Sequence, residues 1–210
     1  MIKILIADDH AVVRAGLRQI LAEQADMAPP GEAANGREVL ESVRREKWDV
    51  VILDITFPDK NGIEILKEIR EEKPDLPVLI LSMHPEDQFA LRALKAGAAG
   101  YMTKEGAADE LVSAIRKVLD GGKFITPSLA ERLAANLKRD AAKNPHDILS
   151  DREFEILCLI ASGKTVGEIA QKIFLSVKTV STYRARLLEK MNMHTNAELV
   201  HYAIQNRLAG

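Results

Sequence analysis

The sequence predicts an α/β fold, a parallel β-sheet with helices on both faces, followed by a second domain that is entirely helical. Between residues 3 and 120, short β-branched runs alternate with amphipathic segments, which is typical of a parallel sheet covered on both faces. After residue 145 only helical periodicity remains. A chain of 210 residues has room for one medium-sized domain and one small one.

Five short segments are predicted strands, and the amphipathic segments between them are predicted helices. The strands are Lys3–Ala7, Gly31–Ala34, Val50–Asp54, Val78–Ser82 and Gly100–Thr103. The helices are Ala11–Gln24, Arg37–Lys47, Gly62–Glu72, Glu86–Ala96 and Ala107–Asp120. Because a helical segment follows each strand, neighbouring strands are joined by crossovers, which makes the sheet parallel.

The second strand, at Gly31–Ala34, has the weakest strand pattern. Pro29 and Pro30 precede it and cannot donate hydrogen bonds within a sheet, so this segment belongs at a sheet edge. A flavodoxin-like, doubly wound sheet of five strands in the order 2-1-3-4-5 places the second strand at an edge. We therefore expect this strand order.

The sequence divides into a first domain at 1–124, a linker at 125–147 and a second domain at 148–210. Two adjacent glycines end the last helix of the first domain, and an Asn-Pro pair precedes the second. Between them, Ser128–Ala142 is charged and rich in alanine, which predicts a helix within the linker.

Composition and charge indicate an ordinary folded protein. With 47% hydrophobic and 29% charged residues and a net charge of −2, the chain is not of the disordered class. The apolar segment Met1–Ala7 is interrupted by Lys3 and is too short for a signal sequence or a membrane span. We therefore expect a cytoplasmic protein with no membrane partner. The single cysteine, Cys158, lies in an apolar helical pattern, which predicts a buried thiol.

Three acidic residues come at the ends of predicted strands. Asp8 and Asp9 follow the first strand, and Asp54 ends the third. These strands are neighbours in the expected order, so we expect the three carboxylates to meet at the carboxyl edge of the sheet. Crowded carboxylates repel each other, and a hard divalent cation such as Mg²⁺, bound by oxygen atoms, relieves that repulsion.

Ser82, at the end of the fourth strand, and Lys104, after the fifth, are expected at the same edge. A hydroxyl, an ammonium and a metal beside Asp54 suit phosphoryl transfer to that carboxylate. Taken singly, each residue has a simpler interpretation: the aspartates and Ser82 as helix caps or turn residues, and Lys104 as a solvated charge. The convergence of four strand ends on one edge favours a site.

Several motifs together resemble the NarL/FixJ class of two-component response regulators, which join a CheY-like receiver domain to a LuxR-type helix-turn-helix domain. The resemblance covers essentially the whole chain. The motifs in the receiver part are Ala7-Asp8-Asp9-His10, Leu53-Asp54 with Pro58 and Gly62, Leu81-Ser82, and Gly100-Tyr101 with Lys104.

The resemblance implies that a sensor histidine kinase phosphorylates Asp54 and that phosphorylation controls DNA binding and transcription. The metal-binding residues for Mg²⁺ would be Asp8, Asp9, Asp54 and Thr56, the last through its backbone carbonyl. The phosphoryl-binding and switch residues would be Ser82, Tyr101 and Lys104. Tyr101 is expected to turn inward on phosphorylation, and the recognition helix to be freed from the receiver. Such a protein catalyses its own phosphorylation and dephosphorylation but has no separate substrate, so we do not expect an enzyme.

Two enzymatic or cofactor-binding alternatives are weaker. Phosphatases of the haloacid dehalogenase type also use an aspartyl nucleophile beside Mg²⁺, but they carry a second aspartate two residues later, where this chain has Thr56. No glycine-rich dinucleotide fingerprint follows the first strand. Thr56 and His84 lie two residues beyond Asp54 and Ser82, where water would approach, and we hypothesise that they set the lifetime of the phosphoryl group.

Residues 149–210 resemble LuxR-type helix-turn-helix domains. Ser150 and Glu153 have the spacing of a capping box ahead of the first helix. Glu168-Ile169-Ala170 marks the scaffold helix, and Ser176 is expected to cap the recognition helix.

The recognition helix, predicted at Val177–Met191, has two unlike faces. The face expected in the core carries Val177, Val180, Leu187, Leu188 and Met191. The residues predicted to contact double-stranded DNA are Lys178, Thr179, Ser181, Thr182 and Arg186. Arg184 and Lys190 are weaker candidates. A solvated basic face is the alternative, but the tight turn and short helix before this segment favour DNA binding.

One recognition helix buries too little surface for tight operator binding, so we expect a homodimer on DNA. In the last helix, Leu199, Val200 and Ala203 form an apolar stripe that we predict to lie between the two copies, although core packing explains it equally well. RNA polymerase is a further candidate partner. The remaining alternative is a receiver that signals through protein contacts, with a helical domain that only dimerises. Salt-dependent retention on DNA would distinguish it.

Overall fold

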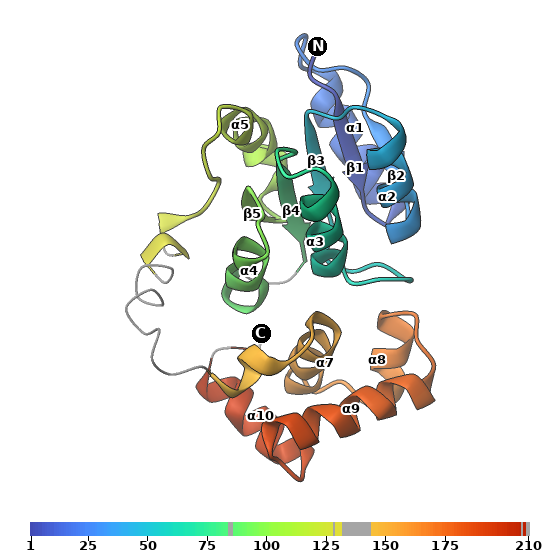
Figure 1. Cartoon of the computed structure of the whole chain (residues 1–210), viewed down its shortest axis with the longest axis vertical. Helices are drawn as coiled ribbons and strands as arrows, with labels where there is room; N and C mark the ends of the chain where they lie inside the picture. Colours follow the sequence, from blue (N-terminus) through green and yellow to red (C-terminus); the bar gives the residue numbers. More distant parts are fainter. Residues whose placement is uncertain (84–85, 128, 132–143, 207, 209–210) are drawn as a thin grey trace. The chain divides into compact units, whose positions relative to one another are not determined.

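The computed structural model describes residues 1–83, 86–127, 129–131, 144–206 and 208, without the side chains of residues 86–88. The chain forms two compact units, Met1–Pro127 and Ser128–Gly210, which are considered separately below (Figure 1). His84 and almost all of the helix predicted within the linker lie outside the described residues. Of that helix, residues 129–131 are described and are helical.

The first unit contains an all-parallel sheet of five strands in the order β2-β1-β3-β4-β5, as the sequence predicts. The strands are β1 (Ile4–Ala7), β2 (Gly31–Ala33), β3 (Val50–Leu53), β4 (Val78–Ser82) and β5 (Gly100–Thr103). In the register, Ala7 lies beside Leu53, and Leu53 lies beside Ile80. The residues that follow β1 and β3 are therefore level with each other at the carboxyl edge of the sheet.

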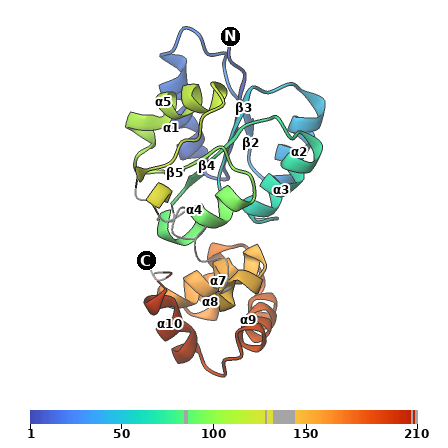
Figure 2. The same ribbon diagram turned by 60° about the vertical axis from the view of Figure 1, so that its left-hand side comes forward.

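Five helices cover the two faces of this sheet (Figures 1 and 2). They are α1 (Ala11–Ala22), α2 (Gly36–Arg45), α3 (Gly62–Glu72), α4 (Glu86–Lys95) and α5 (Ala107–Leu119). Helices α1 and α5 pack together on one face, while α2, α3 and α4 lie in sequence along the other. Each predicted helix is confirmed, with ends that differ from the expected ones by two residues or fewer.

The core follows the alternation of side chains along the strands. Ile4 and Ile6 of β1, and Val50 and Ile52 of β3, point to the same face and join one buried cluster with the leucines of α1 and α5. Every residue of β1 and β3 is buried, because a parallel sheet with helices on both faces leaves no strand face in solvent.

The second unit is helical in its described part. Its elements are the 3₁₀ helix η1 (Pro145–Ile148) and the α-helices α7 (Asp151–Ala161), α8 (Val166–Lys172), α9 (Val177–Met191) and α10 (Asn196–Gln205). Helix α7 packs against both α9 and α10, and α8 packs against α9. The Ser150 capping box and the Ser176 cap are both present, as predicted. Among the described residues, no helix combines the length and the apolar character needed to cross a membrane.

Four of the five side chains predicted for the inner face of α9 are at least partly buried. Val180, Leu187 and Met191 are in the core, and Leu188 is half-buried. The prediction for Val177 is wrong, since its side chain is 56% exposed. Val177 is the first residue of the helix, directly after the Ser176 cap, and the buried residues of α9 begin one turn later at Val180.

Gly62 is required by close packing between the start of α3 and the end of β3. A Cβ atom at this position would lie 2.0 Å from the carbonyl oxygen of Asp54 and 2.7 Å from the Cα atom of Ile55. Both are backbone atoms, so no side-chain rotation relieves the overlap. We predict that Gly62→Ala lowers the free energy of unfolding by about 2–4 kcal/mol, measured by urea denaturation.

Gly16, in the exposed middle of α1, provides the matched control. A Cβ atom there would meet nothing within 4 Å. Gly16→Ala should raise the free energy of unfolding by about 0.5–1 kcal/mol, because alanine restricts the unfolded chain and favours helix. Equal effects from the two substitutions would contradict the packing argument for Gly62.

Candidate functional site

The carboxyl edge of the sheet brings Asp8 and Asp54 together in a buried position. The backbone N–H of Asp54 donates to the carbonyl of Ala7 at 2.9 Å, which continues the β1–β3 pairing by one residue. Asp8 and Asp54 are only 1% and 3% exposed. One oxygen of each carboxylate accepts from a backbone N–H: Asp8 Oδ1 from His10 at 2.8 Å and Asp54 Oδ1 from Ile55 at 2.7 Å.

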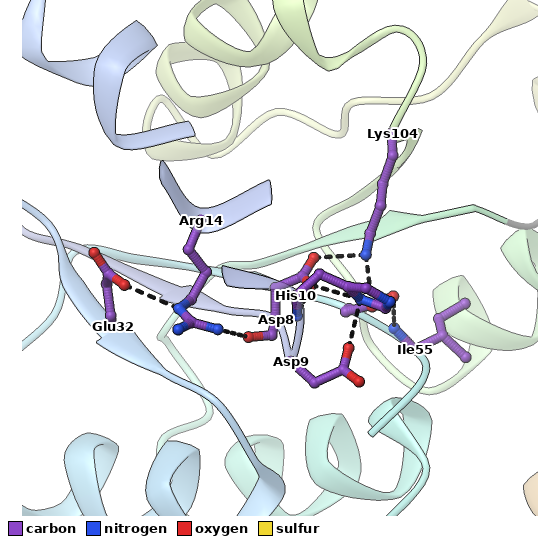
Figure 3. A network of polar contacts seen from close by, with 8 residues as sticks. Asp8, Asp9, His10, Arg14, Glu32, Ile55 and Lys104 are labelled. Carbon is purple, nitrogen blue, oxygen red and sulfur yellow. Dashed lines mark hydrogen bonds and ion pairs between the residues drawn. The ribbon is translucent and has the colours of Figure 1, made fainter. Parts of the chain in front are cut away.

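Lys104 lies between these two carboxylates, and Figure 3 shows its side chain reaching Asp8. Its Nζ atom is 2.6 Å from Asp8 Oδ2 and 2.7 Å from Asp54 Oδ2. Its backbone N–H donates to the carbonyl of Ser82 at 2.8 Å, so the residue after β5 is also fixed to the end of β4. The ends of β1, β3 and β4 are therefore all in contact with Lys104, the residue after β5, two through its ammonium group and one through its backbone N–H.

Asp9 and His10 complete the acidic pocket, which we define as Asp8, Asp9, His10, Asp54 and Lys104. One ligand atom from each of the first four residues lies within 4.8 Å of the others. Asp8 Oδ2 and Asp9 Oδ1 are buried and accept no hydrogen bond of regular geometry from any described residue. Their close neighbours are Lys104 Nζ and His10 Nδ1, the latter 2.7 Å from Asp9 Oδ1. His10 is the N-cap of α1, although its ring caps no backbone N–H of that helix.

The electrostatics of the pocket follow from burial and from the number of charges. Burial raises the pKa of the Asp54 carboxyl to about 6, although Lys104 acts in the opposite direction, and Asp8 adds to the rise. Burial alone would lower the pKa of the Lys104 ammonium, but Asp54 and Asp8 raise it above the ordinary value. Lys104 is therefore charged at neutral pH, and the ionised form of Asp54 is held at a cost in free energy.

Thr56, Ser82 and Tyr101 have different positions around the pocket. Thr56 is half-buried in the loop after β3 and forms an isolated bridge with Asn61. Ser82 is fully buried as the last residue of β4. The ring of Tyr101, in β5, is also fully buried. Ser82 and Tyr101 are therefore both closed to solvent, and the switch role that the family resemblance implies for them stays a prediction.

Two further residues hold segments at this edge of the sheet and were not found from the sequence. Arg14, on α1, donates to the backbone carbonyl of Asp8 at 2.7 Å and to Glu32 of β2 at 2.9 Å (Figure 3). Asp59, in the loop after β3, accepts from the N–H groups of Gly36 and Arg37 at the start of α2. The contacts of Arg14 with β2 and of Asp59 with α2 join different elements, so helical or strand periodicity could not indicate them.

In the second unit, the face of α9 predicted to contact DNA is open to solvent. The side chains of Lys178, Ser181, Thr182 and Arg186 are exposed, and that of Thr179 is partly exposed. The hydroxyls of Ser181 and Thr182 donate to backbone carbonyls one turn earlier, at 2.8 and 3.0 Å. This face therefore carries short hydroxyl side chains that are held close to the helix, together with the basic side chains of Lys178 and Arg186.

Sequence comparisons agree with both halves of the structure. Residues 4–116 match the family described as "Response regulator receiver domain", and residues 147–203 match "Bacterial regulatory proteins, luxR family". The chain belongs to the NarL/FixJ class of two-component response regulators. Its first unit is a receiver domain and its second a LuxR-type DNA-binding domain.

Similar regulators match this response regulator over nearly its whole length. Response regulator UvrY of Escherichia coli K12 is 37% identical, with 99% of this chain and 96% of that protein covered. The oxygen regulatory protein NreC of Staphylococcus carnosus is 40% identical over 98% of each chain. Among solved structures, RcsB of Salmonella enterica serovar Typhimurium bound to the rprA promoter with the phosphomimetic BeF₃⁻ has a TM-score of 0.63 at 27% identity, with 96% and 98% of the two chains covered.

Two basic residues of the LuxR-type domain are engaged within the domain itself. Arg184 donates to Asn196 Oδ1 at 2.6 Å, which joins α9 to α10. Lys190 donates to Glu153 Oε2 at 2.7 Å, which joins α9 to α7. Both contacts connect helices of one core, so these side chains are less available to a partner than Lys178 and Arg186.

The predicted dimer stripe on α10 requires a correction. Leu199 and Ala203 are 0% exposed, and the helix that carries them packs on α7. They belong to the core of the LuxR-type domain and cannot also meet a second copy. Val200 is half-buried. Ile204, one turn after Val200, is 61% exposed.

The raised pKa of Asp54 predicts how the stability of the receiver domain depends on pH. Because the folded carboxyl has a pKa of about 6 and an unperturbed one titrates near 3.8, the folded state binds the proton more tightly. Stability attributable to Asp54 should therefore fall as the pH rises from about 4 to about 6 and stay low above that range. In EDTA, Asp54→Asn should gain about 2–3 kcal/mol over the wild type at pH 7.5 and almost nothing at pH 4.

Denaturant unfolding of both proteins across this pH range checks the expectation. Asp75→Asn, which makes the same chemical change at an exposed carboxyl in the loop before β4, is the control for the substitution itself. A difference between Asp54→Asn and the wild type that stays constant with pH would show that burial in the acidic pocket does not disfavour the charge.

Proposed function

We propose that Asp54 accepts a phosphoryl group from a sensor histidine kinase and that its phosphorylation controls DNA binding by the LuxR-type domain. One observation carries the proposal: Lys104 Nζ lies within 2.7 Å of the carboxylates of both Asp54 and Asp8 at the carboxyl edge of the sheet. A buried ammonium beside the acceptor oxygen is placed to neutralise the charge that a phosphoryl group brings. We propose no separate substrate for this protein.

In the transfer, an oxygen of the Asp54 carboxylate forms a bond to phosphorus. The bond between phosphorus and the ring nitrogen of the kinase histidine breaks, and the electron pair of that bond remains on the nitrogen. The Lys104 ammonium can follow the negative charge from the carboxylate to the phosphoryl oxygens, since its aliphatic stem is flexible. Ser82, at the end of β4, is proposed to donate a hydrogen bond to one of these oxygens.

The acidic pocket fits Mg²⁺ by the chemistry of its oxygens. Asp8 Oδ2 and Asp9 Oδ1 are buried acceptors without a regular hydrogen bond from the described residues, and hard divalent cations prefer such ligands. Three carboxylates also face a single ammonium, so the pocket has an excess of negative charge. The proposed ligands are Asp8, Asp9, Asp54 and the backbone carbonyl of Thr56. When bound, Mg²⁺ supplies charge neutralisation at the acceptor and phosphoryl oxygens.

The proposed switch connects the acidic pocket, at the carboxyl end of β5, with Tyr101 near the start of that strand. The hydrogen bond from the Lys104 N–H to the Ser82 carbonyl joins the two strand ends, so a shift at Ser82 can reach β5, in which Tyr101 lies. We propose that phosphorylation favours the inward position of Tyr101 and frees the recognition helix α9 from the receiver domain. The response is then a shift between two populations of one fold.

The proposed partner of the LuxR-type domain is double-stranded DNA, bound by two copies of the chain. The DNA contacts are proposed at Lys178, Thr179, Ser181, Thr182 and Arg186, where α9 is open to solvent. The exposed side of α10, with Ile204 and Val200, is the proposed contact between the copies in place of the buried residues. A solved structure of RcsB described as two dimers on two parallel DNAs supports the binding of DNA by two copies. RNA polymerase is a further proposed partner.

Phosphorylation should require Asp54, Lys104 and Mg²⁺. With acetyl phosphate as donor, we predict that the wild type gains one phosphoryl group in Mg²⁺, detected by intact-protein mass spectrometry. Asp54→Asn should gain none, and Lys104→Gln should be phosphorylated about 100-fold more slowly, since one charge-stabilising donor is lost. Asp75→Asn should behave as the wild type. Unaltered labelling of Asp54→Asn would place the acceptor elsewhere.

DNA binding should depend on the basic face of α9. After genomic capture with the phosphorylated protein identifies a duplex, Lys178→Ala and Arg186→Ala should each weaken its binding about tenfold at physiological salt and reduce the salt slope by about one. Lys47→Ala removes an exposed lysine from the receiver domain and should change neither quantity. Retention of full affinity in both α9 variants would exclude this face as the DNA-binding surface.

A further inference from the structure

The ends of five helices in the described part of the chain share one backbone motif. In each, a residue with positive φ donates its N–H to the carbonyl three residues earlier, and the next residue donates to the carbonyl five residues earlier. Glycine normally occupies the positive-φ position of this motif, since it has no Cβ, and asparagine is the common substitute. The five residues are Gly97, Gly121, Gly163, Phe174 and Asn192.

Phe174 is the exception among the five. Its φ is 53°, a conformation that is unfavourable for an aromatic L-residue. Its ring is also 58% exposed, so the side chain gains only part of the packing that could compensate for the strain. Neither local conformation nor the core of the LuxR-type domain accounts for phenylalanine here. A residue type that is unfavourable for its own backbone conformation is expected where the side chain contacts a partner.

The surroundings of Phe174 indicate which partner. The residue forms the turn between α8 and α9, two residues before the Ser176 cap of the recognition helix. Val177, the exposed first residue of α9, lies one turn before Ser181, whose hydroxyl donates to the Val177 carbonyl. Two exposed lysines, Lys172 and Lys178, flank the turn. Two exposed apolar side chains flanked by two lysines suit a partner that is a polyanion and also has apolar groups on its surface.

We propose that Phe174 and Val177 pack against the DNA duplex, on its deoxyribose and thymine methyl groups, when α9 enters the major groove. This inference rests on the proposed DNA-binding function and adds an apolar contact at the entrance of the recognition helix. Thymine methyls and sugars are the apolar surfaces that side chains meet at a groove. Such a contact releases no counterions, so it contributes affinity that does not depend on salt.

The experiment measures stability and DNA affinity for Phe174→Gly in the full-length protein. Glycine removes the ring and also the strain at positive φ, so the melting temperature should be equal to or higher than that of the wild type. Affinity for the captured duplex should fall about tenfold by fluorescence anisotropy. The fall should be the same at low and high salt, with an unchanged salt slope, unlike that of Lys178→Ala.

Asn192→Gly is the matched control, because it makes the same kind of change in the same motif at the far end of α9. It should leave DNA affinity unchanged. Val177→Ala, which retains the helix, should weaken binding in the same salt-independent way as Phe174→Gly.

The outcomes separate this inference from the proposed function. If Phe174→Gly binds the duplex as the wild type does while Arg186→Ala fails to bind, the ring does not contact DNA and the DNA-binding face stands. A melting temperature below that of the wild type would show that the ring stabilises the domain, and would also overturn the inference. Unchanged DNA affinity with reduced transcription by RNA polymerase in vitro would assign the ring to a protein partner instead. If the wild type itself binds no DNA, both proposals fail.

Discussion

The receiver domain depends on one lysine between two buried carboxylates. Without Lys104, Asp8 and Asp54 would place two negative charges side by side in the low-dielectric interior, where the penalty is large. With it, both oxygens have a cationic neighbour within 2.7 Å, yet the pocket keeps excess negative charge because Asp9 is close by. The excess charge costs stability, as the raised pKa of Asp54 indicates, and it suits the cation and the phosphoryl group that we propose for this pocket.

Several features of the fold serve to keep that contact in place. The parallel register makes the ends of β1 and β3 level, and the Lys104 N–H fixes the end of β5 to β4. Gly62 lets α3 begin directly against the Asp54 carbonyl, and Arg14 holds the carbonyl of Asp8 from α1. Each contact uses backbone atoms, so the positions of the carboxylates follow from the main chain and vary little with side-chain rotamers.

Much of this arrangement could be predicted from the sequence, because the carboxyl ends of parallel strands lie at the same edge of the sheet and the strand order shows which ends are neighbours. The strand order, the convergence of Asp8, Asp54 and Lys104, and the Ser150 capping box follow from local patterns and topology. The roles of Arg14 and Asp59 could not be predicted, since each joins segments remote in sequence. Leu199 shows the limit of periodicity: an apolar stripe identifies a covered face but not what covers it.

Val177 and Phe174 are two further residues whose surroundings could not be predicted from the sequence. Helical periodicity predicts Val177 in the core, but this residue is the first of α9 and its side chain is exposed. Nothing in a single sequence indicates that Phe174 adopts positive φ, because that conformation arises from the way α8 ends and α9 begins. Such positions become visible only when equivalent motifs in one structure are compared.

The two outer strands of the sheet also affect how copies of this protein can associate. β2 is only three residues long and carries exposed Glu32, which is bound by Arg14 and Arg18, while the free side of β5 is occupied by Phe124, which exchanges hydrogen bonds with Ala99 and Tyr101. Short, charged or covered edges discourage strand addition and aggregation. Strand pairing between copies is thereby discouraged at both edges, so the two-copy assembly that we propose on DNA would depend on helices rather than on the sheet.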